Sequence, residues 1–245
     1  MAQKHWPIGR GVRSAILQLI DEEAVVVELG SGDGTKWLTE RYDVWSVEHN
    51  EEWIGLCDKS KYIHAPIITL EDGKTEWYNP AILQENLPVN YDLLLVDGPP
   101  GTFGRQGLLE QFHLFRTDVP IIIDDTIRTE EAEIARELAY KLSRPLYVFW
   151  NFSIISPKPL SSKQISKIQS DAIGVLQEED ETYLKRYFKS PALYKVPNKE
   201  DWGRLYKEYK LESTKLERII NSWSYRIGRF ITYPIRTMVQ FFQRK

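Results

Sequence analysis

Three aspartates stand at the ends of apolar runs that have the composition of buried strands. Asp124 and Asp125 close the run IIIDD, and Asp97 closes the run LLLVD. The carboxyl ends of neighbouring parallel strands meet at one edge of a sheet, where ligands bind. Carboxylates that converge there repel each other and are costly to bury unpaired, so a cation is expected between them. A divalent ion with oxygen ligands, most simply Mg²⁺, would bind to Asp97, Asp124 and Asp125.

A second interpretation of the aspartates needs no metal. Asp124 or Asp125 could cap the helix expected near residue 129, or pair with Arg128. Arg105 and Arg128 flank the acidic residues in the sequence, and they could clamp an anionic acceptor such as a uronate or a phosphate. Either arginine could equally be a solvated loop residue, so the sequence leaves these alternatives open.

A glycine-rich turn follows the first apolar run, in VVVELGSGDGT. Glycines let the backbone approach a ligand closely, and the helix that follows begins with free N–H groups. Glu48 ends the next strand, 18 positions after Gly30, which suits a grip on a ribose diol. The third glycine of a dinucleotide fingerprint is absent. Glu28 inside the first strand can instead meet a cationic amino group.

The elements that would position these residues alternate between strand-like and helix-like patterns. This alternation predicts an α/β doubly wound sheet. Strands are expected at 24–30, 43–50, 61–70, 91–97 and 119–126, with a closing pair of short strands in 146–157. Helices are expected at 11–22, 51–59, 105–116, 129–143 and from 161 onward, and residues 71–90 are expected to form a loop.

The motifs VVVELGSGDGT and VWSVEHN resemble the first two motifs of the class I S-adenosylmethionine-dependent methyltransferases. The resemblance implies a Rossmann-like, mostly parallel, seven-stranded sheet with helices on both faces and a C-terminal helical extension. It also implies a cofactor site. Glu28, Gly30, Ser31 and Gly32 would line the methionine half, Glu48 would hold the ribose hydroxyls, and Asp97 would border the cofactor.

An aspartate after the fourth strand and an Asp-Asp pair after the fifth resemble metal-dependent O-methyltransferases of the catechol and macrolide-sugar types. This resemblance covers roughly residues 25–157. It implies that a metal binds two neighbouring hydroxyls of the acceptor and acts as a Lewis acid. The catechol enzymes have a lysine base three residues after the first metal aspartate, where this chain has Pro100. Asp97 or His113 is therefore the predicted catalytic base.

The chain is predicted to have three regions: a catalytic domain at 1–158, a helical extension at 159–198 and a basic amphipathic tail at 199–245. Residues 219–245 contain five basic residues and no acid, in a chain of net charge −3. Their apolar residues recur every three or four positions, which suits the surface of an anionic membrane, contacted through 213–245. The alternative is a helix that pairs within a homo-oligomer or packs against the core. The stretch SWSYRIGRFITYPIR resembles C-terminal tails of bacterial surface-polysaccharide enzymes, which implies a sugar or glycan acceptor and points to a lipid-linked glycan.

The composition restricts the function classes. A negative net charge argues against a nucleic-acid binder, and a single cysteine fits a reducing compartment. No apolar run reaches the roughly 18 residues of a membrane span, so the chain is predicted to be cytoplasmic. The basic tail would place it at the inner face of the cell membrane. The predicted function is a metal-assisted O-methyltransferase of a sugar hydroxyl in surface-polysaccharide or glycolipid synthesis. The alternatives are a metal-independent small-molecule methyltransferase and a membrane-tethered, non-catalytic binding module.

Overall fold

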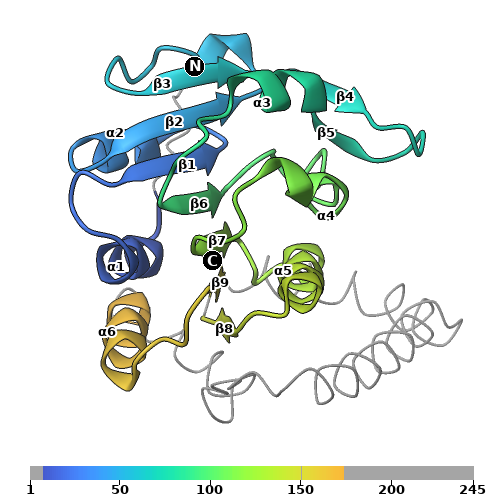
Figure 1. Cartoon of the computed structure of the whole chain (residues 1–245). Helices are drawn as coiled ribbons and strands as arrows, with labels where there is room; N and C mark the ends of the chain where they lie inside the picture. Colours follow the sequence, from blue (N-terminus) through green and yellow to red (C-terminus); the bar gives the residue numbers. More distant parts are fainter. Residues whose placement is uncertain (1–7, 150, 174–245) are drawn as a thin grey trace, which may run out of the picture. The chain divides into compact units, whose positions relative to one another are not determined.

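A single sheet of seven strands organises the described part of the chain, which in this computed structural model comprises residues 8–149 and 151–173. The strand order is β3-β2-β1-β6-β7-β9-β8 (Figure 1). β9 pairs antiparallel with both β7 and β8, and the other four strand pairs are parallel. The strands are β1 (Val25–Leu29), β2 (Asp43–Glu48), β3 (Lys61–His64), β6 (Leu93–Val96), β7 (Ile121–Asp124), β8 (Leu146–Val148) and β9 (Phe152–Ile155). The predicted mostly parallel seven-stranded sheet is confirmed.

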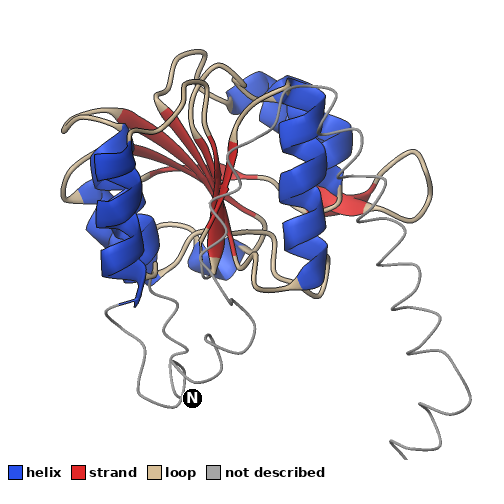
Figure 2. Cartoon of the chain, turned by 90° about the horizontal axis from the view of Figure 1, so that it is seen from below, coloured by secondary structure: helices blue, strands red, loops and turns tan. Residues whose placement is uncertain are grey.

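Helices cover both faces of this sheet (Figure 2). In Figure 1, α1, α2 and α6 lie on one side of the sheet, and α3, α4 and α5 lie on the other. The helices are α1 (Arg10–Leu19), α2 (Asp33–Thr39), α3 (Pro80–Asn86), α4 (Gly107–Gln111), α5 (Thr129–Leu142) and α6 (Ser162–Ile173), with short 3-10 turns η1 (Glu51–Trp53) and η2 (Phe112–Leu114). The predicted doubly wound, Rossmann-like arrangement is therefore present.

Buried aliphatic side chains hold the sheet between its helices. Val12 and Ile16 of α1 belong to the same buried cluster as Val26, Leu93 and Ile122 of the central strands. Burying one such side chain contributes about 1.5–3 kcal/mol. The central strands are apolar on both faces because both are covered, which explains why they appear as continuous Val, Ile and Leu runs in the sequence.

Several predicted elements differ from the structure. The strand expected at 61–70 is broken near Pro66: β3 ends at His64, and β4 (Ile67–Thr69) pairs antiparallel with β5 (Glu76–Tyr78) in a separate small sheet. A proline has no N–H group for the ladder, so the long strand does not continue through it. The loop expected at 71–90 instead contains β5 and α3. The helix expected at 51–59 is reduced to η1.

The C-terminal predictions are tested only in part. Helix α6 lies in the predicted extension at 159–198. Residues 174–198 and the predicted basic tail at 199–245 lie outside the described residues. Among the helices that the structure describes, none has the length and apolar character required to cross a membrane.

Candidate functional site

A cavity of about 340 Å³ opens at the carboxyl edge of the sheet. Its walls come from the ends of β1, β2, β6 and β7, around the place where β1 and β6 are neighbours. From β1 the sheet continues through β2 in one direction, and from β6 it continues through β7 in the opposite direction. Such a reversal of strand order is where ligands bind in open α/β sheets. Most of the predicted site residues line the cavity: Glu28, Gly30, Ser31, Gly32, Glu48, Asp97 and Asp125.

Glu28 is a buried carboxyl group in the first of these strands. Its Oε1 accepts hydrogen bonds from Thr35 Oγ1 at 2.6 Å and Ser46 Oγ at 2.5 Å. Burial raises the pKa of Glu28 to about 7, with a smaller contribution from the charge of Glu48, although the two hydroxyl bonds act in the opposite direction. A buried carboxyl poised in this way can meet a cationic amino group, which would favour its ionised form.

Glutamine at position 28 is expected to stabilise the ligand-free protein above pH 7. Because the pKa is raised, folded Glu28 keeps its proton between about pH 4.5 and 7, where the unfolded chain has lost it. The free energy of unfolding therefore falls across this window, by roughly 3 kcal/mol at 1.36 kcal/mol per pH unit. Urea unfolding at pH 5 and pH 8 measures the effect of Glu28→Gln.

The matched control is Glu40→Gln, at an exposed glutamate that follows α2. We expect this control to leave the pH dependence unchanged, whereas Glu28→Gln should flatten it. A Glu28→Gln protein with the same loss of stability between pH 5 and pH 8 as the unmodified chain would contradict this account. The carboxylate is also the predicted partner of the cofactor's amino group, so the same substitution should weaken binding of S-adenosylhomocysteine.

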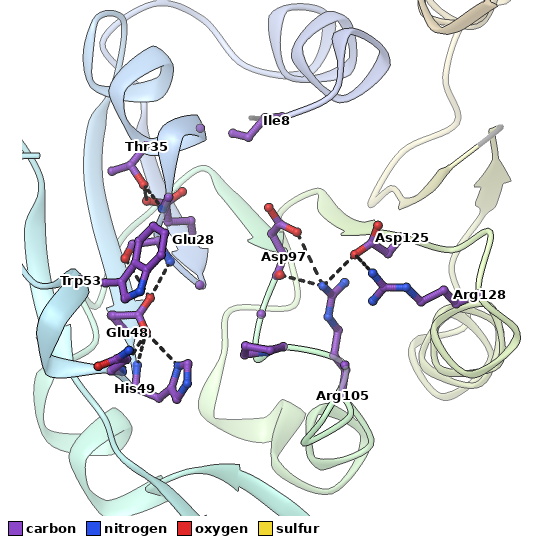
Figure 3. A pocket seen from close by; sticks show the side chains of 18 residues that line it. Ile8, Glu28, Thr35, Glu48, His49, Trp53, Asp97, Arg105, Asp125 and Arg128 are labelled. Atoms are coloured by element: carbon purple, nitrogen blue, oxygen red, sulfur yellow. Dashed lines mark hydrogen bonds and ion pairs between the residues drawn. The ribbon is translucent and has the colours of Figure 1, made fainter. Parts of the chain in front are cut away.

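Glu48 is held by donors on both of its carboxylate oxygens. Oε2 accepts from the Ser31 backbone N–H at 2.9 Å and from Ser31 Oγ at 2.8 Å. Oε1 accepts from the backbone N–H groups of His49 and Asn50, each at 2.8 Å. The carboxylate therefore joins the glycine-rich turn after β1 to the turn after β2. Figure 3 shows Glu28, Thr35, Glu48 and Trp53 on one side of the cavity.

On the other side of the cavity, the buried guanidinium group of Arg105 lies among the aspartates (Figure 3). The side chain of Arg105 is 2% exposed, and its Nη2 lies 3.6 Å from Asp97 Oδ1 and 3.3 Å from Asp125 Oδ2. Asp125 also pairs with Arg128 at 3.0 Å. Burial raises the pKa of Asp97 and of Asp124, and for Asp97 the charge of Asp124 is the next cause. Arginine therefore supplies the cations that the aspartates require.

The predicted metal site does not fit this arrangement. Within residues 8–149 and 151–173, no three Asp, Glu, His or Cys side chains come together closely enough to hold a metal ion. Asp124 does not line the cavity, and its Oδ1 accepts from the Asp125 N–H at 2.8 Å and Asn151 Nδ2 at 3.3 Å. The open alternative in which Asp125 pairs with Arg128 is present. The predicted metal set of Asp97, Asp124 and Asp125 is thus not supported by the geometry.

The position of His113 does not support its predicted role as a base. His113 lies in η2, is exposed, and is absent from the lining of the cavity. Helix α4 ends at Gln111, and the tighter turn that follows carries the next residues away from a continued helix face. Asp97, which is 32% exposed and lines the cavity, is the base candidate that the structure retains.

Sequence reasoning missed several lining residues. His49, Asn50 and Trp53 border the cavity beside Glu48, and Ile8 borders it from the segment before α1. The signal for the first three was their position: they follow a strand end that was already predicted to bind a ligand. Ile8 carries no comparable signal, because it reaches the site only through the packing of its segment against Gly34 of α2.

The solved structures compared below are distant likenesses of this chain. No family model and no curated protein matches the chain. Among solved structures, MycE methyltransferase from the mycinamycin biosynthetic pathway, in complex with Mg and SAH, has 14% identity and a TM-score of 0.39, covering 62% of this chain and 48% of that chain. A methyltransferase-like protein from Silicibacter pomeroyi DSS-3 has 18% identity and a TM-score of 0.43, covering 68% and 97%.

An rRNA methylase from Streptococcus thermophilus has 16% identity and a TM-score of 0.35, covering 64% of this chain and 98% of that chain. The chain spans about half the length of MycE. Because likenesses this distant do not transfer a function, the fold is taken from the strand order and register described above, and the function from the cavity.

Proposed function

We propose that this chain is an S-adenosylmethionine-dependent methyltransferase that acts on a sugar hydroxyl in bacterial surface-polysaccharide or glycolipid synthesis. The observation that supports methyl transfer is the cavity at the β1–β6 junction, with Glu28 and Glu48 on one side and Asp97 on the other. The residues present fit the cofactor: Glu28 for its amino group, the turn from Gly30 to Gly32 for close backbone approach, and Glu48 for its ribose.

The protein must align the acceptor hydroxyl with the methyl group of the cofactor, and it must remove the proton of that hydroxyl. When bound, S-adenosylmethionine supplies an electrophilic methyl group carried on a sulfonium ion. Asp97 stands at the acceptor side of the cavity and would accept the proton of the acceptor hydroxyl. Its raised pKa suits a base that works near neutral pH. No step in this proposal uses a metal ion, because the aspartates do not fit one.

The sugar acceptor and the membrane contact rest on the sequence alone. They are supported by the basic, acid-free stretch 219–245 and by its resemblance to tails of polysaccharide enzymes. A lipid-linked or anionic glycan and a homo-oligomer belong to the same proposal. A non-catalytic binding module and a metal-independent small-molecule methyltransferase are the competing functions.

Two measurements test the proposed function. Calorimetric titration with S-adenosylhomocysteine should show micromolar binding by the full chain. Incubation with S-adenosylmethionine and a panel of glycan, lipid-linked sugar, amine and carboxylate acceptors should then methylate a sugar hydroxyl, detected by mass spectrometry. Binding without transfer to any acceptor would favour the binding module, transfer to an amine would remove the hydroxyl specificity, and no binding would overturn the proposal.

Asparagine at position 97 is expected to slow methyl transfer while largely preserving the binding of S-adenosylhomocysteine. The amide cannot accept the acceptor's proton as a carboxylate does, so the transfer rate should fall by roughly 10²–10⁴-fold. The affinity for S-adenosylhomocysteine should change far less than the transfer rate, because Asp97 only borders the cofactor and the substitution leaves Glu28 and Glu48 in place. Asp118→Asn, at an exposed aspartate paired with Arg116, is the matched control. If Asp97→Asn transferred methyl groups at the unmodified rate, Asp97 would not be the base.

A further inference from the structure

Arg105 is the most heavily engaged side chain at the site, and the proposed function leaves it without a role. Its Nη1 donates to the backbone carbonyl of Asp124 at 2.8 Å and to that of Val96 at 3.3 Å. Its Nη2 donates to the carbonyl of Asp97 at 2.6 Å, and its Nε donates to the carbonyl of Pro99 at 3.4 Å. One side chain thus joins the end of β6, the turn after it and the end of β7.

The same guanidinium group contacts the carboxylates of both Asp97 and Asp125, which line the cavity. Its Nη2 lies 3.6 Å from Asp97 Oδ1 and donates to Asp125 Oδ2 at 3.3 Å. Asp125 adopts a positive φ of 62°, a conformation that is uncommon outside glycine and persists where surrounding contacts determine it. Arg128 approaches the same Oδ2 at 3.0 Å. Asp125 is therefore fixed by two guanidinium groups.

We propose that Arg105 is a positioning residue that takes the place of a divalent metal ion in this site, an inference that rests on the proposed function. Its guanidinium group neutralises the acidic edge and holds Asp97 against the acceptor side of the cavity, so methyl transfer proceeds without a bound metal. The planar fork of an arginine suits this role because it can serve several carbonyl and carboxylate oxygens at once. A lysine ammonium group is a single point charge and cannot span the same set.

Metal binding provides the first test, and it needs no acceptor. The full chain, saturated with S-adenosylhomocysteine, is titrated with MnCl₂ and followed by calorimetry. We expect no saturable binding of Mn²⁺. We also expect the heats of the MnCl₂ titration to be the same for the unmodified chain and for Asp124→Asn. Saturable binding of one Mn²⁺ per chain that Asp124→Asn abolishes would overturn the inference. Failure of the unmodified chain to bind S-adenosylhomocysteine would instead overturn the proposed function, so the two failures are distinguishable.

Variants of Arg105 provide the second test, with the acceptor identified by the panel. Arg105→Lys should bind S-adenosylhomocysteine like the unmodified chain but lose about 100-fold in transfer rate, as expected for a misplaced catalytic group. In Arg105→Gly, added guanidinium chloride at non-denaturing concentration should raise the transfer rate in proportion to its concentration. The matched control is Arg116→Gly, because Arg116 also contacts a carboxylate and a carbonyl but lies away from the cavity.

Rescue distinguishes positioning from a merely structural role, because a protein that has lost its fold does not regain activity from a small ion. Full activity of Arg105→Lys would overturn the inference, and so would loss of transfer by the unmodified chain in EDTA. If Arg105→Gly does not fold, Arg105→Lys and the MnCl₂ titration of the unmodified chain still decide the question.

Discussion

Alanine at position 98 is expected to lower the free energy of unfolding by about 3 kcal/mol, at the upper end of overpacking effects, and to abolish binding of the proposed cofactor. Gly98 lies where the turn after β6 touches the turn after β1. A Cβ added there would meet the Tyr78 hydroxyl and would lie 2.8 Å from Gly30 Cα and 2.9 Å from Gly30 N. The backbone of Gly30 cannot yield as the end of a flexible side chain can.

The expected loss of binding has the same origin. Gly30 has φ +87°, and its own Cβ position would lie 3.0 Å from the backbone of Gly98. Because neither Gly30 nor Gly98 has a Cβ, the backbones of the two turns can approach each other closely. Pushing them apart moves the turn that is predicted to lie under the methionine half of the cofactor, so Gly98→Ala should lose affinity for S-adenosylhomocysteine as well as stability.

Gly101→Ala is the control for this prediction. A Cβ at Gly101 would lie 3.3 Å from Arg128 Nη1, the end of a flexible and 46% exposed side chain. We expect less than about 0.5 kcal/mol of change there, as for ordinary surface substitutions. Urea unfolding and calorimetry compare the two variants. Equal stability of Gly98→Ala and Gly101→Ala would show that the contact between the two turns is not as tight as described.

The positions of the residues predicted to bind the cofactor could be derived from the sequence, because they depend on local patterns. Glu28, Gly30 and Glu48 each occupy a fixed place relative to a strand end, and strand ends are visible in the sequence as limits of apolar runs. Parallel pairing then brings those ends to one edge without further information. The same reasoning correctly placed Asp97 beside Asp125. It also required a cation near them, and that requirement is met.

The identity of the cation was not predictable, because it depends on how a loop folds back. Arg105 lies eight positions beyond Asp97, in a segment that sequence patterns assign to a helix start or a solvated loop. Its burial follows from the turn through Pro99 and Pro100, which returns the side chain to the ends of β6 and β7. A spacing of aspartates that resembles a metal site therefore has two solutions, and the sequence could not choose between them.

The break of the third strand shows a different limit. Pro66 was a visible signal, and the residue before a proline is biased toward an extended conformation, so a strand ending there was compatible with the pattern. The hairpin of β4 and β5 was not predicted, because each of its strands has three residues and is too short to show an alternation of apolar and polar side chains. Its consequence reaches the site, since Tyr78 of β5 is the side chain that packs behind Gly98.

Glutamine at position 48 is expected to weaken binding of S-adenosylhomocysteine by about 100-fold, or about 2.7 kcal/mol. Both oxygens of Glu48 accept from N–H groups: Ser31 on one side, His49 and Asn50 on the other. An amide offers only one acceptor oxygen, so in either orientation its NH₂ group faces a donor. Hydrogen bonds to charged groups contribute roughly 1.5–3 kcal/mol each.

The substitution therefore loses more than a charge, because it separates the turn after β1 from the turn after β2. We expect the free energy of unfolding to fall by roughly 2 kcal/mol as well, the cost of leaving a buried donor unpaired. Glu51→Gln, at the exposed neighbour in η1, should change neither quantity. Calorimetry and urea unfolding measure both. If Glu48→Gln bound S-adenosylhomocysteine as tightly as Glu51→Gln, the carboxylate would hold the two turns without gripping the cofactor, and its predicted contact with the ribose would be wrong.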